Sequence, residues 1–255
     1  MKSIVYLSLL FSLFSSSSFA QDDLFGEKKS PINKGFIFGA NFHLDFPSAD
    51  MAKRFGTSIR VGPSIQYKTD KNYFIGLTWD FLNGGNIKED SLLINITDAS
   101  GQVLNQAGQK IGLSILERGY TTGIQLGRLF NVSKRNGDNG ILWMNTIGFI
   151  QHKINIYNKD NAIPQLKSDY IKGYDRLTNG WFIEEYLGYA VFAKNELINF
   201  HVGISCMLGF TQGRRDYLFD VMRPGNEKRT DILMGLHLGW YIPIFHRDNV
   251  EFSFE

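Results

Sequence analysis

Cysteine is almost absent from this chain. Cys206 is the single cysteine among 255 residues, so no disulfide can form within one molecule. The protein is therefore stabilised without internal covalent cross-links. We interpret Cys206 as a small apolar side chain on the lipid-facing side of a strand.

Long apolar runs are also missing. After residue 20 there is no run of about 18 apolar residues, the length that a membrane-spanning helix needs. Proline is scarce, with 6 residues, whereas the chain has 26 glycines, 21 phenylalanines and 11 tyrosines. Glycine relieves crowding inside a small β-barrel, and aromatic residues form the interfacial girdles of membrane barrels. The composition therefore excludes a helical membrane protein and favours a barrel.

A strong excess of one charge is missing as well. The net charge is +2 at pH 7, which gives no reason to expect a nucleic-acid partner. Residues 1–20 contain Lys2, an apolar stretch from Ile4 to Phe14 and the small-x-small sequence Ser18-Phe19-Ala20, which predicts a secretory signal peptide. Residues 21–34 are polar and are expected to form a periplasmic N-terminal lead-in.

The segment 35–46 has the clearest periodicity in the chain. Every second position is apolar: Phe36, Phe38, Ala40, Phe42, Leu44 and Phe46. A side-chain period of two predicts a β-strand, here with one fully apolar face. The segment also has about the 9–11 residues with which a tilted strand crosses a bilayer.

Seven further segments alternate in the same way. Together they predict eight strands: 35–46, 56–69, 73–82, 112–130, 140–156, 181–192, 197–211 and 230–245. Pro63 lacks a ladder donor and predicts a bulge, and a slip in the apolar phase predicts another bulge near Gln151. Residues 92–109 are expected to form an extra hairpin beyond the membrane, and residues 250–254 a short strand or a tail.

The connections between these strands alternate in length. They are short after the second, fourth and sixth strands and mostly long after the others. Bacterial outer-membrane barrels have an even number of strands, short periplasmic turns and long surface loops. The sequence therefore predicts an all-β, eight-stranded antiparallel transmembrane β-barrel over residues 35–255, with long extracellular loops and both termini in the periplasm.

A soluble eight-stranded barrel is the competing architecture, because it would turn its apolar face inward. The polar face of these strands is rich in glycine, which is too small to build a solvated exterior. Tyrosine and tryptophan lie near the strand ends, as in an interfacial belt. Both observations favour the membrane barrel. In a barrel of eight strands the side chains fill the interior, so a wide pore is not expected.

Ionisable residues on the predicted inward face are the candidates for chemistry. We expect an interior charge network of Arg60, Asp45, Asp80 and Glu184, in which buried polar groups satisfy one another. The alternative is a lipid- or surface-acting hydrolase or acyltransferase, with His43, Asp45, Asp80 and Glu184 as catalytic residues, because a histidine and a carboxylate can activate water or a hydroxyl. No nucleophile motif accompanies His43 and the five histidines lack metal-ligand spacing, so we expect no metal or cofactor and favour a non-enzymatic role.

Two loops contribute candidate binding residues. Segment 212–229 is basic and contains Arg214 and Arg215, which could meet anionic lipid headgroups or a protein partner. Segment 174–180 contributes Asp175 and Arg176. An ordinary solvated loop is an equally good interpretation of either segment.

Four short segments carry a resemblance to a known group of proteins: Glu117-Arg118-Gly119, Gly148-Phe149-Ile150-Gln151-His152-Lys153-Ile154, Lys172-Gly173-Tyr174-Asp175-Arg176-Leu177-Thr178-Asn179-Gly180 and Gly239-Trp240-Tyr241-Ile242-Pro243-Ile244. In these the chain resembles small outer-membrane barrels typical of Bacteroidota. The resemblance implies fold and outer-membrane location, and it carries no catalytic residues. Members of this phylum build large outer-membrane machines, including the type IX secretion system, from many barrel subunits.

These observations lead to three functional hypotheses. The first is a non-enzymatic structural or accessory subunit of a larger envelope complex for secretion or biogenesis, acting through its surface loops. Its expected partners are outer-membrane lipid and outer-membrane proteins, and not nucleic acid. The second is the surface-acting enzyme, and the third is a narrow channel past Arg60.

Overall fold

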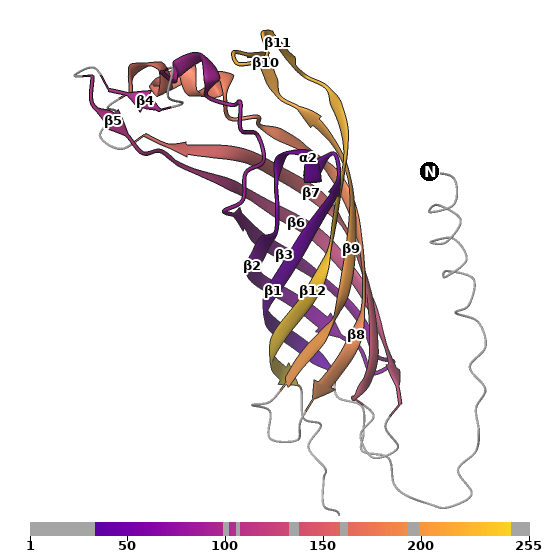
Figure 1. The fold of residues 1–255 in the computed structure, drawn as a ribbon. Coiled ribbons are helices and arrows are strands. Elements are labelled where there is room, and N and C mark those ends of the chain that lie inside the picture. Colours follow the sequence, from indigo (N-terminus) through magenta and orange to yellow (C-terminus); the bar gives the residue numbers. More distant parts are fainter. Residues whose placement is uncertain are drawn as a thin grey trace, which may run out of the picture.

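The computed structural model describes residues 34–98, 102–105, 108–132, 138–158, 163–192 and 199–245. The predicted signal peptide, the lead-in up to residue 33 and the segment 250–254 lie outside these residues. Eight long strands form a closed barrel in the order β1-β12-β9-β8-β7-β6-β3-β2 (Figure 1). This confirms the predicted fold class. No helix in the described part of the chain is long and apolar enough to cross a membrane.

The barrel strands are β1 (Gly35–Ala49), β2 (Ser58–Lys68), β3 (Tyr73–Gly84), β6 (Ser114–Asn131), β7 (Gly140–Tyr157), β8 (Thr178–Phe192), β9 (Asn199–Gly213) and β12 (Lys228–Phe245). Each overlaps one predicted segment, and the ends differ by a few residues. Every strand pairs antiparallel with its neighbours along the chain, and β1 also pairs with β12. The closure leaves no open sheet edge, which a sheet surrounded by lipid requires.

The shorter elements lie together at one end of the barrel (Figure 1), which we call the loop end. They are α2 (Met51–Arg54), η1 (Ile94–Ile96), β4 (Val103–Leu104), β5 (Lys110–Ile111), η3 (Pro164–Leu166), η4 (Ser168–Gly173), β10 (Arg215–Leu218) and β11 (Arg223–Gly225). The opposite end, with the β2–β3, β6–β7 and β8–β9 connections, is the turn end. The hairpin predicted over 92–109 is wrong in its first half, because the consecutive Leu92 and Leu93 are both buried and a 3-10 helix follows them.

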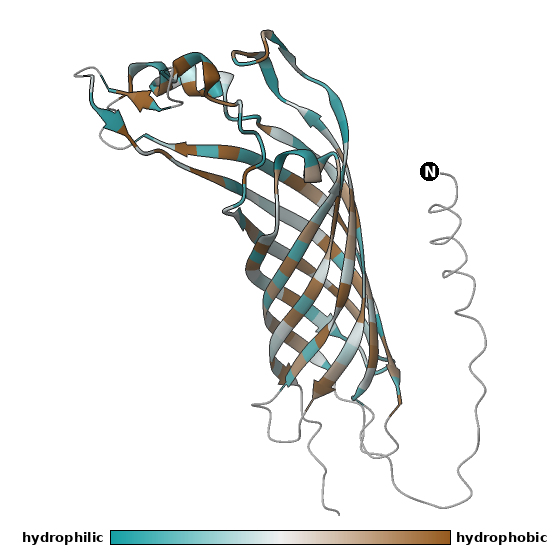
Figure 2. Ribbon diagram, viewed as in Figure 1, coloured by the Kyte–Doolittle hydropathy of each residue, from teal (hydrophilic) through white to brown (hydrophobic). Residues whose placement is uncertain are grey.

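The outward face of the barrel wall is apolar. Brown segments recur along the barrel strands in Figure 2, and exposed large apolar side chains come from every barrel strand. Examples, one from each strand, are Phe42, Val61, Leu77, Ile124, Ile147, Ile183, Ile204 and Leu236. A closed barrel with an apolar exterior and a polar lumen is typical of β-barrels that span a lipid bilayer. The structure is that of a membrane-spanning β-barrel.

The face of strand β7 that carries apolar side chains changes along the strand. Toward the turn end apolar side chains lie on both faces, Ile147 outward and Leu142 inward, whereas Ile150, Ile154 and Ile156 are all buried on the inner face. The pairing of β7 with β6 and β8 continues through Gln151 without a register shift. The bulge predicted there is therefore wrong: the apolar phase changes because Ile150, Ile154 and Ile156 pack into a buried apolar cluster at the loop end.

The bulge predicted at Pro63 is also wrong. The β1–β2 register runs through Pro63 without interruption, and β2 keeps a single register with β3 on both sides of it. The β2–β3 ladder omits Gly62 and Pro63. Proline removes a hydrogen-bond donor at this point without shifting the strand.

Two apolar clusters are buried inside the molecule. One lies at the loop end and includes Met51, Phe55, Leu92, Ile163 and Leu166. The other fills the barrel toward the turn end and includes Ile37, Phe74, Leu142, Phe192 and Tyr241. The loop-end cluster packs the connections against the barrel mouth, so the loops have a core of their own.

Candidate functional site

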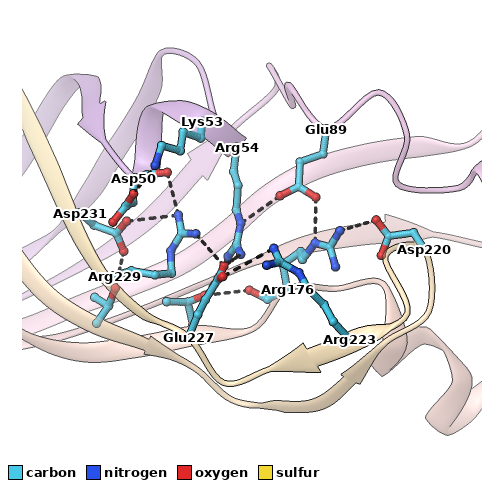
Figure 3. Close-up of polar contacts among 12 residues, drawn as sticks. Asp50, Lys53, Arg54, Glu89, Arg176, Asp220, Arg223, Glu227, Arg229 and Asp231 are labelled. Atoms are coloured by element: carbon cyan, nitrogen blue, oxygen red, sulfur yellow. Dashed lines mark hydrogen bonds and ion pairs between the residues drawn. The ribbon is translucent and has the colours of Figure 1, made fainter.

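Ion pairs join all four connections at the loop end (Figure 3). Glu89, in the β3–β6 connection, lies 2.9 Å from Arg54 Nε on α2 and 2.8 Å from Arg176 Nε. Arg176 belongs to the β7–β8 connection and also pairs with Asp220 in the β9–β12 connection. Three charged contacts thus fasten segments that are far apart in the sequence.

A second carboxylate, Glu227, extends this arrangement. Its Oε1 lies 3.0 Å from Arg54 Nη2 and 3.5 Å from Arg229 Nη1, and its Oε2 lies 3.6 Å from Arg223 Nη2. Arg229 also donates to the backbone oxygen of Asp50 at 2.7 Å. We call the whole set the loop-end ion cluster: Arg54, Glu89, Arg176, Asp220, Arg223, Glu227 and Arg229.

Burial makes these charges depend on one another. The side chains of Arg54, Arg176 and Asp220 are 8%, 5% and 1% exposed. Burial, together with the positive charges of Arg229 and Arg176, lowers the pKa of Arg54 to about 10. Burial also opposes the charge of Arg176, but Glu89 and Asp220 raise its pKa above the ordinary value. Removing one member would leave its partner charged, buried and unpaired.

Two clefts open beside the cluster. The first, of about 460 Å³, is lined by Arg54, Lys88, Glu89, Asp90, Ser91, Arg176, Asp220, Val221 and Arg223. The second, of about 630 Å³, is more apolar, with Leu92, Leu93, Ile94, Val103, Ile111 and Leu113 among its lining residues. Glu89 and Asp90 line both clefts, so a charged wall and an apolar wall lie side by side.

The predicted binding residues occupy different places at the loop end. Arg176 lines the first cleft and belongs to the ion cluster. Arg215 Nε donates to Asp175 Oδ1 at 2.7 Å, so these two residues pair with each other. Arg214 Nε donates to Asn179 Oδ1 at 2.6 Å. Of the four, only Arg176 lines either of these clefts.

The predicted interior residues gather around Arg60 in the lumen. Arg60 Nε lies 2.7 Å from Asp45, and its Nη2 lies 2.7 Å from Glu184 and 3.2 Å from His43 Nδ1. Asp80 bonds to other partners: it accepts a hydrogen bond from Thr78 Oγ1 at 3.0 Å.

These interior residues have almost no contact with solvent. His43 is 2% exposed, Asp45 0%, Asp80 2% and Glu184 6%. A general base has to reach the proton that it abstracts, directly or through one water. Neither loop-end cleft is lined by any of these four residues.

Three histidines that looked scattered in the sequence lie together in the lumen. The His43 and His237 rings stack with centroids 3.7 Å apart, and His201 meets His237 edge-on at 4.7 Å. His201 Nδ1 lies 2.7 Å from the Tyr186 hydroxyl. Within the described residues, no group of three or more His, Cys, Asp or Glu side chains is placed to hold a metal ion. The rings pack against one another and fill the lumen.

Sequence reasoning missed the acidic half of the loop-end ion cluster. Glu89 and Arg176 are 87 residues apart, and Arg54 and Glu227 are 173 apart. Loops have no side-chain period from which such pairs can be found. The one usable signal was the density of arginines in segment 212–229.

No known protein family matches this chain, and no curated protein matches it. Solved structures show a weak likeness. Ail, the attachment invasion locus protein of Yersinia pestis, has a TM-score of 0.42 and 10% identity over 82% of this chain and 98% of that chain. Neisserial surface protein A has a TM-score of 0.39 and 9% identity, over 80% of this chain and 96% of that chain. The outer membrane protein OprG from Pseudomonas aeruginosa has a TM-score of 0.37 and 9% identity, over 86% of this chain and 100% of that chain. The functional conclusions below rest on this chain's own residues.

Proposed function

We propose that this barrel is a non-enzymatic subunit or accessory of a larger envelope complex, and that it binds its partner through the loop end. The observation that carries the proposal is the loop-end ion cluster, which fastens four connections in one arrangement. A surface that is ordered before binding loses less conformational entropy when the partner arrives. In this proposal residues 1–20 are removed on export, the termini are periplasmic and the loop end faces outward.

Exposed apolar side chains on this frame are the proposed contact points. In the β10–β11 hairpin, Tyr217 is 43% exposed, Val221 41% and Met222 67%. Ile94 and Tyr170, in neighbouring connections, are 58% and 64% exposed. Apolar groups rimmed by charged ones are typical of protein-binding surfaces. A secretion or biogenesis machine, of type IX or another kind, is the complex that we favour.

The two other hypotheses have less support. Arg60 and Asp45 are fully buried, which argues against a hydrolytic or acyl-transfer site around His43. A narrow channel needs a continuous wet path, but Arg60 spans the lumen from β2 to Glu184 on β8, and Tyr241 is also fully buried.

The test is co-purification with a matched pair of variants. Tagged full-length protein is extracted from native membranes in mild detergent, and stoichiometric partners are identified by mass spectrometry. The double variant Val221→Ser, Met222→Ser should lose the partner, because it removes exposed contacts without touching the ion cluster. Lys71→Ser, at the turn end, should retain it. Recovery of the chain without any other protein, or a partner kept by the double variant, would contradict the proposal.

A further inference from the structure

A glutamate lies on the lipid-facing wall of the barrel. Along β8, Glu185 belongs to the outward series that also contains Trp181, Ile183, Leu187 and Tyr189. It lies midway between Trp181 and Tyr189, the aromatic residues toward the two edges of the wall on this strand. An ionisable group that faces hydrocarbon is costly, and it marks a functional site unless something covers it.

Two more polar side chains flank this glutamate. Glu185 is the register partner of Asn145 on β7 and of Cys206 on β9, and both side chains point outward. Trp143 Nε1 donates to Glu185 Oε1 at 3.2 Å. A carboxylate offers about four acceptor positions, so the indole uses only a part of its capacity. We call Asn145, Glu185 and Cys206 the wall patch.

The wall around the patch is apolar. Its outward neighbours include Ile147 at 57% exposure, Ile183 at 48% and Ile204 at 62%. The outward Arg128, by contrast, lies near the turn end with its guanidinium 5.0 Å from the Tyr73 ring, where a long side chain can reach the headgroups. The wall patch thus lies among apolar outward side chains, between Trp181 and Tyr189 along β8.

We propose that the wall patch is the contact between two copies of this chain within the membrane. Asn145 and Glu185 are directly opposite each other on neighbouring strands. A two-fold axis along the membrane normal, passing between them, brings Asn145 of each copy against Glu185 of the other. The amide supplies donors and the carboxylate supplies acceptors, so the patch is complementary to itself.

A second copy of the chain can form hydrogen bonds with this patch, whereas acyl chains cannot. Acyl chains have no donor for the carboxylate, whereas a copy presents its Asn145 amide, which lies beside Glu185 in the register and so at a similar depth. The flanking side chains Trp181, Ile183 and Leu187 then pack around the polar centre and exclude lipid from it. The proposal concerns the barrel wall and not the loop end, so its test is independent of the test of the proposed function.

The first experiment measures self-association of the full chain in lipid vesicles. Donor- and acceptor-labelled protein is diluted with lipid, and energy transfer gives the dimerisation constant. Glu185→Leu should weaken dimerisation about tenfold, because two reciprocal hydrogen bonds are lost in a low-dielectric setting. The variant should fold, since leucine suits a lipid-facing site, and retained heat-modifiable gel mobility verifies this. Thr122→Leu, an outward polar position on β6, is the matched control and should leave dimerisation unchanged.

The second experiment exchanges the two polar groups. Asn145→Glu alone places like carboxylates against each other across the axis and should abolish dimerisation. Adding Glu185→Asn to it restores the complementary pair with the positions reversed, and should recover most of the association. Because Glu185→Asn would also relieve repulsion between the two neighbouring carboxylates within one chain, gel mobility first has to show that Asn145→Glu alone is folded. Wild-type protein that stays monomeric at every lipid dilution, or dimerisation that Glu185→Leu leaves unchanged, would overturn the proposal.

Discussion

The lumen and the loop end each contain a buried arginine between two carboxylates, but different structures support the two sites. Arg60 meets Asp45 and Glu184 from strands whose positions the backbone ladders already fix. Arg54 meets Glu89 and Glu227 from connections that no long ladder fixes: beside α2 there is one isolated bridge, Phe55 with Ile87, and a few backbone hydrogen bonds. In the lumen, the backbone ladders hold the strands in place, and the ion pairs only neutralise the buried charges. At the loop end, the ion pairs themselves help to hold the connections together.

The largest expected effect comes from removing the lumen arginine. Arg60→Met leaves Asp45 and Glu184 buried without their cation and should lower the free energy of unfolding by about 3–5 kcal/mol. Urea unfolding in detergent micelles, followed by gel mobility, measures the change. The triple variant Arg60→Met, Asp45→Leu, Glu184→Leu should recover most of the loss, because apolar side chains then replace every charge. Equal midpoints for wild type and Arg60→Met would show that the ion pairs do not stabilise the barrel.

A glycine pair tests whether the barrel frame is as rigid as this comparison requires. A Cβ added at Gly235, the register partner of Asp45, would lie 2.0 Å from the Leu44 carbonyl oxygen, whereas Gly85 at the loop end has nothing within 4 Å. Gly235→Ala should therefore cost about 1–3 kcal/mol of stability. Gly85→Ala should change it by less than about 0.5 kcal/mol. The same unfolding assay measures both, and a harmless Gly235→Ala would mean that neighbouring strands can move apart.

Breaking the loop-end frame should have a local effect only. Glu89→Gln weakens both arginine contacts and should increase amide hydrogen exchange in segments 85–98 and 163–177 about tenfold, because these segments open without the barrel. The urea midpoint of the barrel should not change. Asp169→Asn is the control, since Asp169 is an exposed residue that pairs with the nearby Lys172 on the same 3-10 helix. A lower barrel midpoint in Glu89→Gln would show that the two regions unfold together.

The strands could be predicted from the sequence because two physical constraints act together on each of them. The pleat imposes a period of two, and lipid on one side makes half of the positions apolar, so all eight barrel strands were visible. The two predicted bulges failed for different reasons. On β7 the apolar phase changes beyond Phe149 while the register stays intact, because Ile150 and Ile154 pack inward into the loop-end apolar cluster. Pro63 shows that one missing donor does not shift a strand fixed on its other side by β1.

The candidate sites were less predictable. The residues around Arg60 could be proposed because the inward face of a barrel brings its few charged positions into one narrow lumen. The histidine stack was missed, because adjacency of His43, His201 and His237 depends on the register of three strands. The wall patch could have been found from the alternation alone: Glu185 interrupts an outward apolar series.

The smallest expected effect concerns Asp50, where the β1–β2 connection contacts the start of β12. Its Oδ1 lies 2.7 Å from Lys53 Nζ, and its Oδ2 accepts the Thr230 backbone N–H at 2.9 Å. These two bonds lower the pKa of Asp50 below its ordinary value of 3.8. A carboxyl group with a depressed pKa in the folded state contributes stability above its ordinary pKa and loses that stability as the pH falls through the folded value.

Acidification below about pH 3.8 should therefore loosen this contact while the barrel remains folded. The reporter is amide exchange at Thr230, corrected for the intrinsic effect of pH on exchange. In Asp50→Ala the faster exchange should already be present at neutral pH, without a further acid step. An acid step of the same size in Asp50→Ala would assign it to another group, and would place the loop end's acid sensitivity outside the α2–β12 contact.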